Sequence, residues 1–154
     1  MRIFEIFEDL SRRDFIKGVG ATAGSSLLPK SVKGNQVNVY TDKKLQMKVL
    51  KQVLSYMREE YDPSIPFPKV VNSKDVDPEI FVEVYGFPLK RIGNHYHWKR
   101  NLVVLKYNRI DILAHELVHY VQAKYRGQDF TKGGDFLEME AVTIENKFRD
   151  NPIS

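Results

Sequence analysis

The chain has 154 residues and no cysteine, with 24 Lys and Arg against 20 Asp and Glu, a net charge of +4. This length fits a single domain, and the lack of cysteine excludes disulfides and every thiolate-ligated metal site. Hydrophobic residues make up 42% and charged residues 29%, as in ordinary soluble globular proteins. Basic, acidic and aromatic residues are mixed along the chain, so no nucleic-acid-binding surface is expected.

The first 33 residues are predicted to be a targeting segment, followed by one folded domain over residues 34–154. Residues 11–17 read Ser-Arg-Arg-Asp-Phe-Ile-Lys and precede 12 uncharged residues, 18–29. They resemble the twin-arginine export signal of bacteria, which implies an exported, periplasmic protein. The uncharged run is shorter than the ~20 residues of a membrane helix, so no stable membrane span is expected.

Two alternatives for this segment stay open. Residues 1–33 could be a flexible basic arm, since they carry two of the four net positive charges. The opening residues 1–8 also resemble the starts of small phage proteins. That resemblance implies a phage-encoded protein in the host cytoplasm or the virion.

From residue 35 onward the pattern predicts an α+β fold with a small mixed or antiparallel sheet. Strands are expected where residues alternate with period two or are β-branched: at 36–40, near Val70, and at 81–85, 91–98 and 102–107. The last two should form a hairpin that turns at Lys99 and Arg100. The strand 102–107 directly precedes a predicted helix.

Three helices are predicted from apolar residues at helical spacing. The first has Thr41 as its N-cap and buries Leu45, Val49, Val53, Tyr56 and Met57. The second is capped by Asn108, with Asp111 completing a weak capping box, and ends at Gly127. The third is capped by Asp135 and buries Leu137, Ala141, Ile144 and Phe148.

The second helix carries the motif His-Glu-x-x-His at residues 115–119. Residues four apart lie on one face of a helix, so His115 and His119 can bind the same metal ion. Glu116 lies about 100° round the helix, where it could take a proton from water at the metal. Neither Gly nor Pro interrupts residues 109–126, which favours a continuous helix. The alternative is a helix with two surface histidines and a glutamate.

A catalytic zinc ion usually has three protein ligands and one open position. No histidine follows His119, so the third ligand must be a carboxylate on the last helix. Glu138 and Glu140 are the two main candidates, and Glu140 lies closer to the apolar face around Leu137 and Ala141. The remaining carboxylates are Asp129, Asp135 and Glu145. The competing interpretation for each of these carboxylates is a solvent-exposed residue without a ligand role, as is usual for glutamates on a helix.

At residues 101–146 the chain resembles the gluzincins, zinc metallopeptidases that have His-Glu-x-x-His followed by a glutamate on a downstream helix. Several gluzincin families have Glu-x-[Glu/Gln]-Ala-[Asp/Asn] on that helix, and residues 138–141 match the pattern, with Glu138 as ligand. Val142 departs from it, because the family's Asp or Asn there orients a ligand histidine. The resemblance implies a minimal zincin-like fold, one Zn²⁺ ion, a peptide or protein substrate and Glu116 as catalytic base. It also implies that the strand 102–107, directly before the motif helix, is the edge of the sheet that receives an extended peptide.

Three further side chains are candidates for an auxiliary role. His95 and His97 lie two apart on a predicted strand and point to the same side, where they could stabilise an oxyanion. Tyr120 follows the motif directly. For each, packing without a chemical role is the competing interpretation. A monomer is favoured, and the rival function is a non-catalytic, metal-stabilised structural or phage virion-associated module with a zincin fold.

Overall fold

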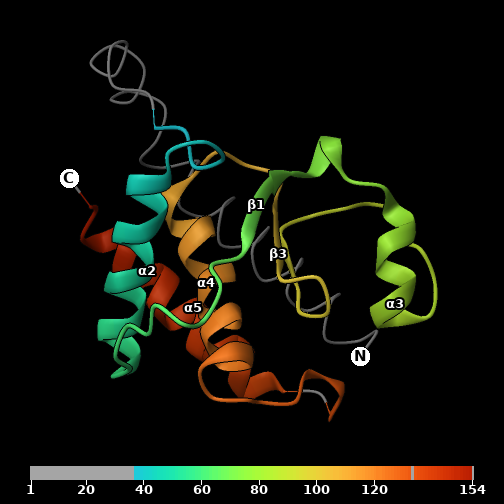
Figure 1. Ribbon diagram of the computed structural model, residues 1–154. Helices are drawn as coiled ribbons and strands as arrows, with labels where there is room; N and C mark the ends of the chain where they lie inside the picture. Colours follow the sequence, from blue (N-terminus) through green and yellow to red (C-terminus); the bar gives the residue numbers. More distant parts are fainter. Residues whose placement is uncertain (1–36, 133, 154) are drawn as a thin grey trace.

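The computed structural model describes residues 37–132 and 134–153, and the predicted targeting segment lies outside this range. The described chain has the predicted α+β architecture (Figure 1). Its helices are α2 (Lys43–Met57), α3 (Val82–Tyr85), α4 (Ile110–Lys124) and α5 (Asp135–Asp150). Its strands are β1 (Lys69–Asn72), β2 (His95–His97) and β3 (Leu102–Leu105), and short 3₁₀ turns cover Ser73–Asp75, Pro78–Phe81 and Phe130–Lys132.

Within the described residues the strands form one mixed sheet in the order β1-β3-β2. β1 pairs in parallel with β3, with Val70 opposite Val103, and β2 pairs antiparallel with β3, with Tyr96 opposite Val103. The hairpin of β2 and β3 is therefore confirmed. The prediction that the strand after this turn is a sheet edge is wrong, because β3 is hydrogen-bonded on both sides.

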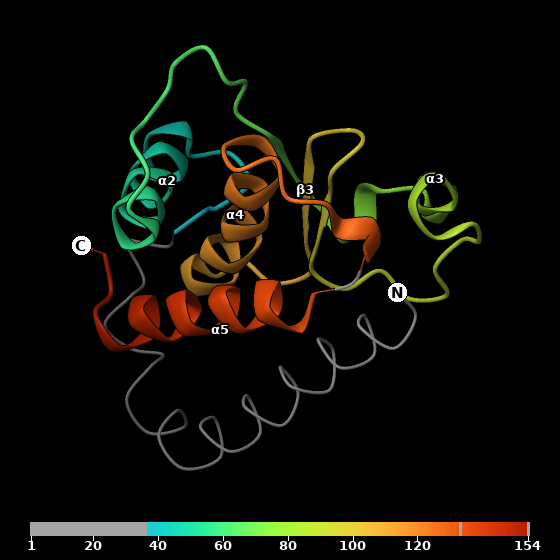
Figure 2. The same cartoon turned by 90° about the horizontal axis from the view of Figure 1, so that it is seen from below.

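Helix α4 occupies the middle of the fold and contacts α2, α5, β2 and β3. In Figures 1 and 2, α2, α4 and α5 lie on one side of the sheet and α3 lies on the other. Figure 2 shows α5 running across α4. This position explains why every residue from Asp111 to Gln122 is buried.

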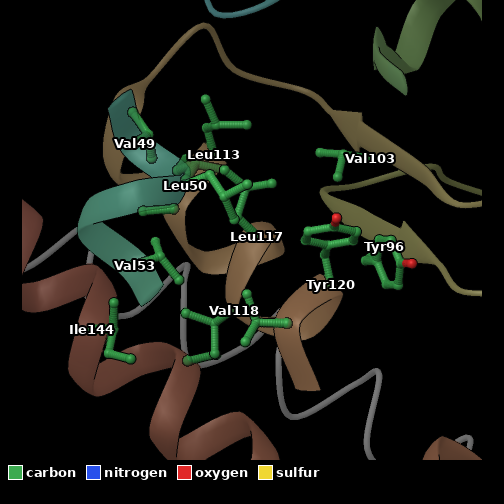
Figure 3. Packing of buried hydrophobic residues seen from close by; sticks show 14 of the residues in the cluster. Val49, Leu50, Val53, Tyr96, Val103, Leu113, Leu117, Val118, Tyr120 and Ile144 are labelled. Atoms are coloured by element: carbon green, nitrogen blue, oxygen red, sulfur yellow. The ribbon is translucent and has the colours of Figure 1, made fainter. Parts of the chain in front are cut away.

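The main hydrophobic core lies between α2, α4, α5 and one face of the sheet (Figure 3). Val49, Leu50 and Val53 of α2 pack toward Leu113 and Leu117 of α4. From the sheet, Tyr96 and Val103 point toward Tyr120, and the rings of Tyr96 and Tyr120 lie 6.0 Å apart. The core face predicted for the last helix is confirmed, since all four of its residues are buried: Leu137, Ala141, Ile144 and Phe148.

A second, smaller cluster lies on the opposite face of the sheet around Phe81, Leu89 and Val104. It contains the segment 81–85, for which the prediction of a strand is wrong: Phe81 ends a 3₁₀ turn and α3 follows. Asp77 caps that turn through the backbone N–H of Glu79, with Pro at its start. Capping and a proline at the first position favour helical geometry and outweigh the weak strand preference of Val and Tyr.

The prediction of a strand at 36–40 is also wrong, because the described residues of this segment lead into a turn. The Asn38 side chain accepts hydrogen bonds from the backbone N–H groups of Tyr40 and Thr41 at 3.0 and 3.3 Å. Such local side-chain bonds compete with strand pairing. Asp42 rather than Thr41 is the N-cap of α2, because its carboxylate accepts from Leu45 N at 3.0 Å.

Two other predicted helix caps also differ from the structure. Arg109 is the N-cap of α4, and Asn108 instead bonds to the backbone of Val39 at 2.9 Å. Gly134 is the N-cap of α5, so Asp135 is its first residue. Helix α4 ends at Lys124, and Gly127 takes a φ of 62° in the turn that follows, a conformation that glycine adopts without strain.

None of the helices in residues 37–132 and 134–153 combines the length and apolar character that a membrane span requires.

Candidate metal centre

The motif helix α4 holds its two histidines in the interior of the protein. His115 and Glu116 are 0% exposed and His119 is 5% exposed, so the alternative of two surface histidines is wrong. Their rings, one helical turn apart, have centroids 5.0 Å from each other. Imidazole and carboxylate groups are seldom buried to this extent without partners, because removal from water costs free energy.

Helix α5 brings Glu138 to these two histidines. Its Oε1 lies 2.9 Å from His115 Nε2, and its Oε2 lies 3.1 Å from His119 Nε2. One ligand atom from each of the three residues lies within 4.8 Å of the others. The structure therefore brings together the three residues that the sequence assigned as ligands, from the middle of α4 and the first turn of α5.

Glu140 points to a different set of partners. Arg126 donates to both of its carboxylate oxygens, at 2.9 and 3.0 Å, and Gln122 donates to Oε1 at 3.0 Å. It is not a member of the group formed by His115, His119 and Glu138. The geometry thus favours Glu138 over its rival.

The Nδ1 atoms of both histidines meet buried hydrogen-bond acceptors. His115 Nδ1 lies 2.6 Å from Glu145 Oε2, and His119 Nδ1 lies 2.8 Å from Gln122 Oε1. The Gln122 amide nitrogen donates to Leu137 O and to Glu140, so its oxygen is the atom that faces His119. In its neutral form each ring therefore carries its proton on Nδ1, and its Nε2 lone pair faces Glu138.

This arrangement places acceptors against acceptors. In neutral histidines of this tautomer, two Nε2 lone pairs face the two carboxylate oxygens of Glu138 at 2.9 and 3.1 Å. Glu138 Oε1 is buried and makes no hydrogen bond within the described residues. A cation at this point would remove the repulsion, and two imidazoles with one carboxylate are ligands that zinc accepts. The buried group formed by His115, His119 and Glu138 can hold a metal ion.

The electrostatic surroundings favour the charged form of Glu138. Burial raises the pKa of the Glu138 carboxyl, but when His115 and His119 are protonated their charges and hydrogen bonds lower this pKa by more, so it lies well below its usual value. An ionised carboxylate is the form that binds a metal ion. Glu138 therefore remains a ligand-competent anion at neutral pH.

The three auxiliary candidates have other partners. His95 bonds to the hydroxyl of Tyr85, with Nε2 at 2.9 Å, and His97 Nε2 bonds to the carbonyl of Ile80 at 2.8 Å. Both rings contact Phe81, on the face of the sheet opposite α4. The Tyr120 hydroxyl donates to the Pro66 carbonyl at 2.9 Å. The structure thus gives all three residues packing contacts away from the metal-binding group.

Two residues at this centre were not assigned their role from the sequence. The sequence pattern offers Glu145 only as one of the less favoured candidates for the third ligand, and it gives Gln122 no role. A signal for Glu145 was present, because it falls beside the apolar stripe of α5, next to Ile144 and one turn after Ala141. A glutamate beside a buried stripe indicates a buried partner.

Comparisons with family models, with curated proteins and with solved structures found no match to this chain. The interpretation of the centre therefore rests on its geometry.

Proposed function

We propose that this protein is a zinc-dependent peptidase of the gluzincin type with a minimal zincin-like fold. One observation carries the proposal: a buried His-Glu-x-x-His helix meets a glutamate of the next helix, and both histidines present Nε2 to it. His115, His119 and Glu138 are the zinc ligands. Two histidines and one glutamate form a ligand set of catalytic rather than structural zinc, since a fourth position stays open for water or substrate.

The residue with the chemical task is Glu116. Zinc in such a site acts as a Lewis acid that makes water more acidic and polarises a carbonyl group. Glu116 accepts the proton of the attacking water and delivers it to the leaving amine. Its position in the motif, directly after His115 on α4, places it beside the ligands rather than among them.

A peptide substrate binds by adding a strand to the sheet. Since β3 is paired on both sides, the strand available for this addition is β1 or β2, the two outer strands of the described sheet. Main-chain hydrogen bonds would hold an extended peptide there with little dependence on its sequence. Broad specificity is therefore expected, and a library of peptides is the right assay.

The test compares the wild type with Glu116→Gln on a broad fluorogenic peptide library, alongside measurement of bound zinc. We expect the variant to keep its zinc and to lose activity by about 10²–10⁴-fold, the usual contribution of a general base. Glu60→Gln is the matched control, because Glu60 is exposed and follows α2. Wild-type protein that binds zinc and cleaves nothing would refute the peptidase and favour the non-catalytic structural or virion-associated module.

A further inference from the structure

Behind the first histidine, on the side away from Glu138, lies a buried hydrogen bond to a carboxylate of α5. His115 Nδ1 and Glu145 Oε2 are 2.6 Å apart. His115 is 0% exposed and Glu145 is 5% exposed, so water does not compete for this bond. A charged acceptor in such surroundings forms a strong hydrogen bond and fixes the orientation of the ring.

Glu145 is itself held from the other side. Arg149 donates to Glu145 Oε1 at 3.0 Å and to Asp111 Oδ2 at 3.2 Å. Asp111 also accepts from Arg109 Nε at 3.0 Å. The guanidinium of Arg149 offsets the cost of burying the Glu145 carboxylate and keeps that carboxylate in place.

The position of Glu145 on α5 is informative. Glu138, Val142, Glu145 and Arg149 follow each other at spacings of four, three and four residues, so they share one stripe of the helix. Val142 lies between Glu138 and Glu145 on this stripe, and its side chain has no hydrogen-bond acceptor. The acceptor for His115 Nδ1 is therefore Glu145, about one turn after Val142 on α5.

We propose that Glu145, fixed by Arg149 and Asp111, is the positioning residue of His115. It holds the proton on Nδ1 and so directs the Nε2 lone pair toward the metal ion. The inference rests on the metal group of the proposed function and does not depend on peptidase activity. His119 is oriented by the neutral amide of Gln122, so the charged acceptor acts on one ligand only and raises the basicity of that ligand.

The experiment measures the zinc dissociation constant by competition with a chromophoric chelator. For Glu145→Ala we expect zinc binding to weaken by about 10- to 100-fold, the range known for partners of metal-bound histidines. Glu145→Gln should lose less, because its amide oxygen still accepts from Nδ1. Asp150→Asn is the matched control: it removes an exposed carboxylate from the end of the same helix and should change the constant by less than about twofold.

A rescue variant separates positioning from general structural damage. In Val142→Asp/Glu145→Ala a carboxylate is placed on the same stripe, one turn nearer to Glu138. We expect the double variant to recover most of the zinc affinity lost by Glu145→Ala. In the metal-free protein, ¹⁵N spectra of the imidazoles should show the His115 proton on Nδ1 in the wild type and a mixture of tautomers in Glu145→Ala.

The outcomes distinguish this inference from the proposed function. Zinc affinity unchanged in a folded Glu145→Ala, or weakened without rescue and with an unchanged tautomer, overturns the positioning role and leaves the peptidase untouched. Glu145-dependent zinc binding without peptide cleavage refutes the peptidase and supports the positioning role. Wild-type protein that binds no zinc overturns both.

Discussion

Helix α4 has two unlike interfaces. Toward α2 it is apolar, with Leu113 and Leu117 packed against Val49 and Leu50 (Figure 3). Toward α5 it buries a row of polar side chains that meet a second polar row: Asp111, His115, His119 and Gln122 on α4, and Glu138, Glu145 and Arg149 on α5.

The two interfaces have opposite energetic characters. Burial of apolar side chains stabilises the fold by roughly 25 cal/mol per Å². Burial of charged groups roughly breaks even when every group is paired, and costs several kcal/mol when one partner is lost. Apolar burial thus accounts for the α2–α4 interface. Between α4 and α5, Ala141, Ile144 and Phe148 also join the apolar core, and the polar row beside them is what the proposed metal centre would require.

The largest expected effect is on the third ligand. Glu138→Ala should weaken zinc binding by about 1,000-fold, since one of three ligands is lost from a site with total binding energy of about 12 kcal/mol, and a third of this, about 4 kcal/mol, corresponds to about three factors of ten. Glu140→Ala should weaken it by less than about tenfold, because Glu140 touches the site only through Gln122. Equilibrium competition for zinc measures both, and the reverse order would make Glu140 the ligand.

A substitution in the apolar α2–α4 interface should lower the stability of the fold without changing metal binding. Leu117→Ala, between the two histidines in sequence, should lower the free energy of unfolding by about 3 kcal/mol and leave one zinc per chain. Val82→Ala is the control: Val82 is 38% exposed, and its loss should cost less than about 0.5 kcal/mol. Denaturant unfolding gives both values. Loss of zinc from folded Leu117→Ala would show that the two interfaces are not separable.

Zinc itself should stabilise the fold through the polar interface. At a free concentration 100 times its dissociation constant, zinc should add about 2.7 kcal/mol to the free energy of unfolding. The same increment should appear in Leu117→Ala and be absent from Glu138→Ala at that concentration. Thermal unfolding with and without a chelator measures it, and an equal gain in all three proteins would assign the stabilisation to some other site.

The smallest effect is expected for the segment before the domain. Deletion of residues 1–33 should leave zinc content unchanged and alter the thermal midpoint little, because the sequence assigns these residues to a targeting segment rather than to the folded domain. Replacement of Arg12 and Arg13 by Lys should retain the protein in the cytoplasm of a bacterial host. Cell fractionation tests the export signal, and unchanged localisation of this double variant would reject the export proposal. A large loss of stability on deletion would mean that the segment docks on the domain.

The accuracy of the sequence-based predictions differed along the chain for physical reasons. The motif helix and the last helix carry long apolar periods, and both were located correctly together with the group of His115, His119 and Glu138. The strands expected at 36–40 and 81–85 were short, and local capping by Asn38 and Asp77 decided their conformation. Short segments have too few residues for periodicity to outweigh such contacts.

The hydrogen-bond partners of the two histidines and the order of the strands in the sheet could not be predicted from the sequence. Which carboxylate reaches His115 Nδ1 depends on how α5 crosses α4, and Glu145 and Val142 lie on the same stripe of that helix. The central position of β3 depends on its pairing with β1, some 30 residues earlier in the chain. Neither the crossing of α4 and α5 nor the pairing of β1 with β3 produces a periodic pattern in the sequence.

The most direct test of the account is elemental analysis of the purified protein beside His119→Ala. We predict one zinc ion per wild-type chain and none in the variant, with the variant still folded by circular dichroism. A different metal in the wild type would keep the centre and reject zinc. Wild-type protein that, after incubation with zinc and gel filtration, retains no more metal than His119→Ala would contradict the central claim that His115, His119 and Glu138 form a metal centre.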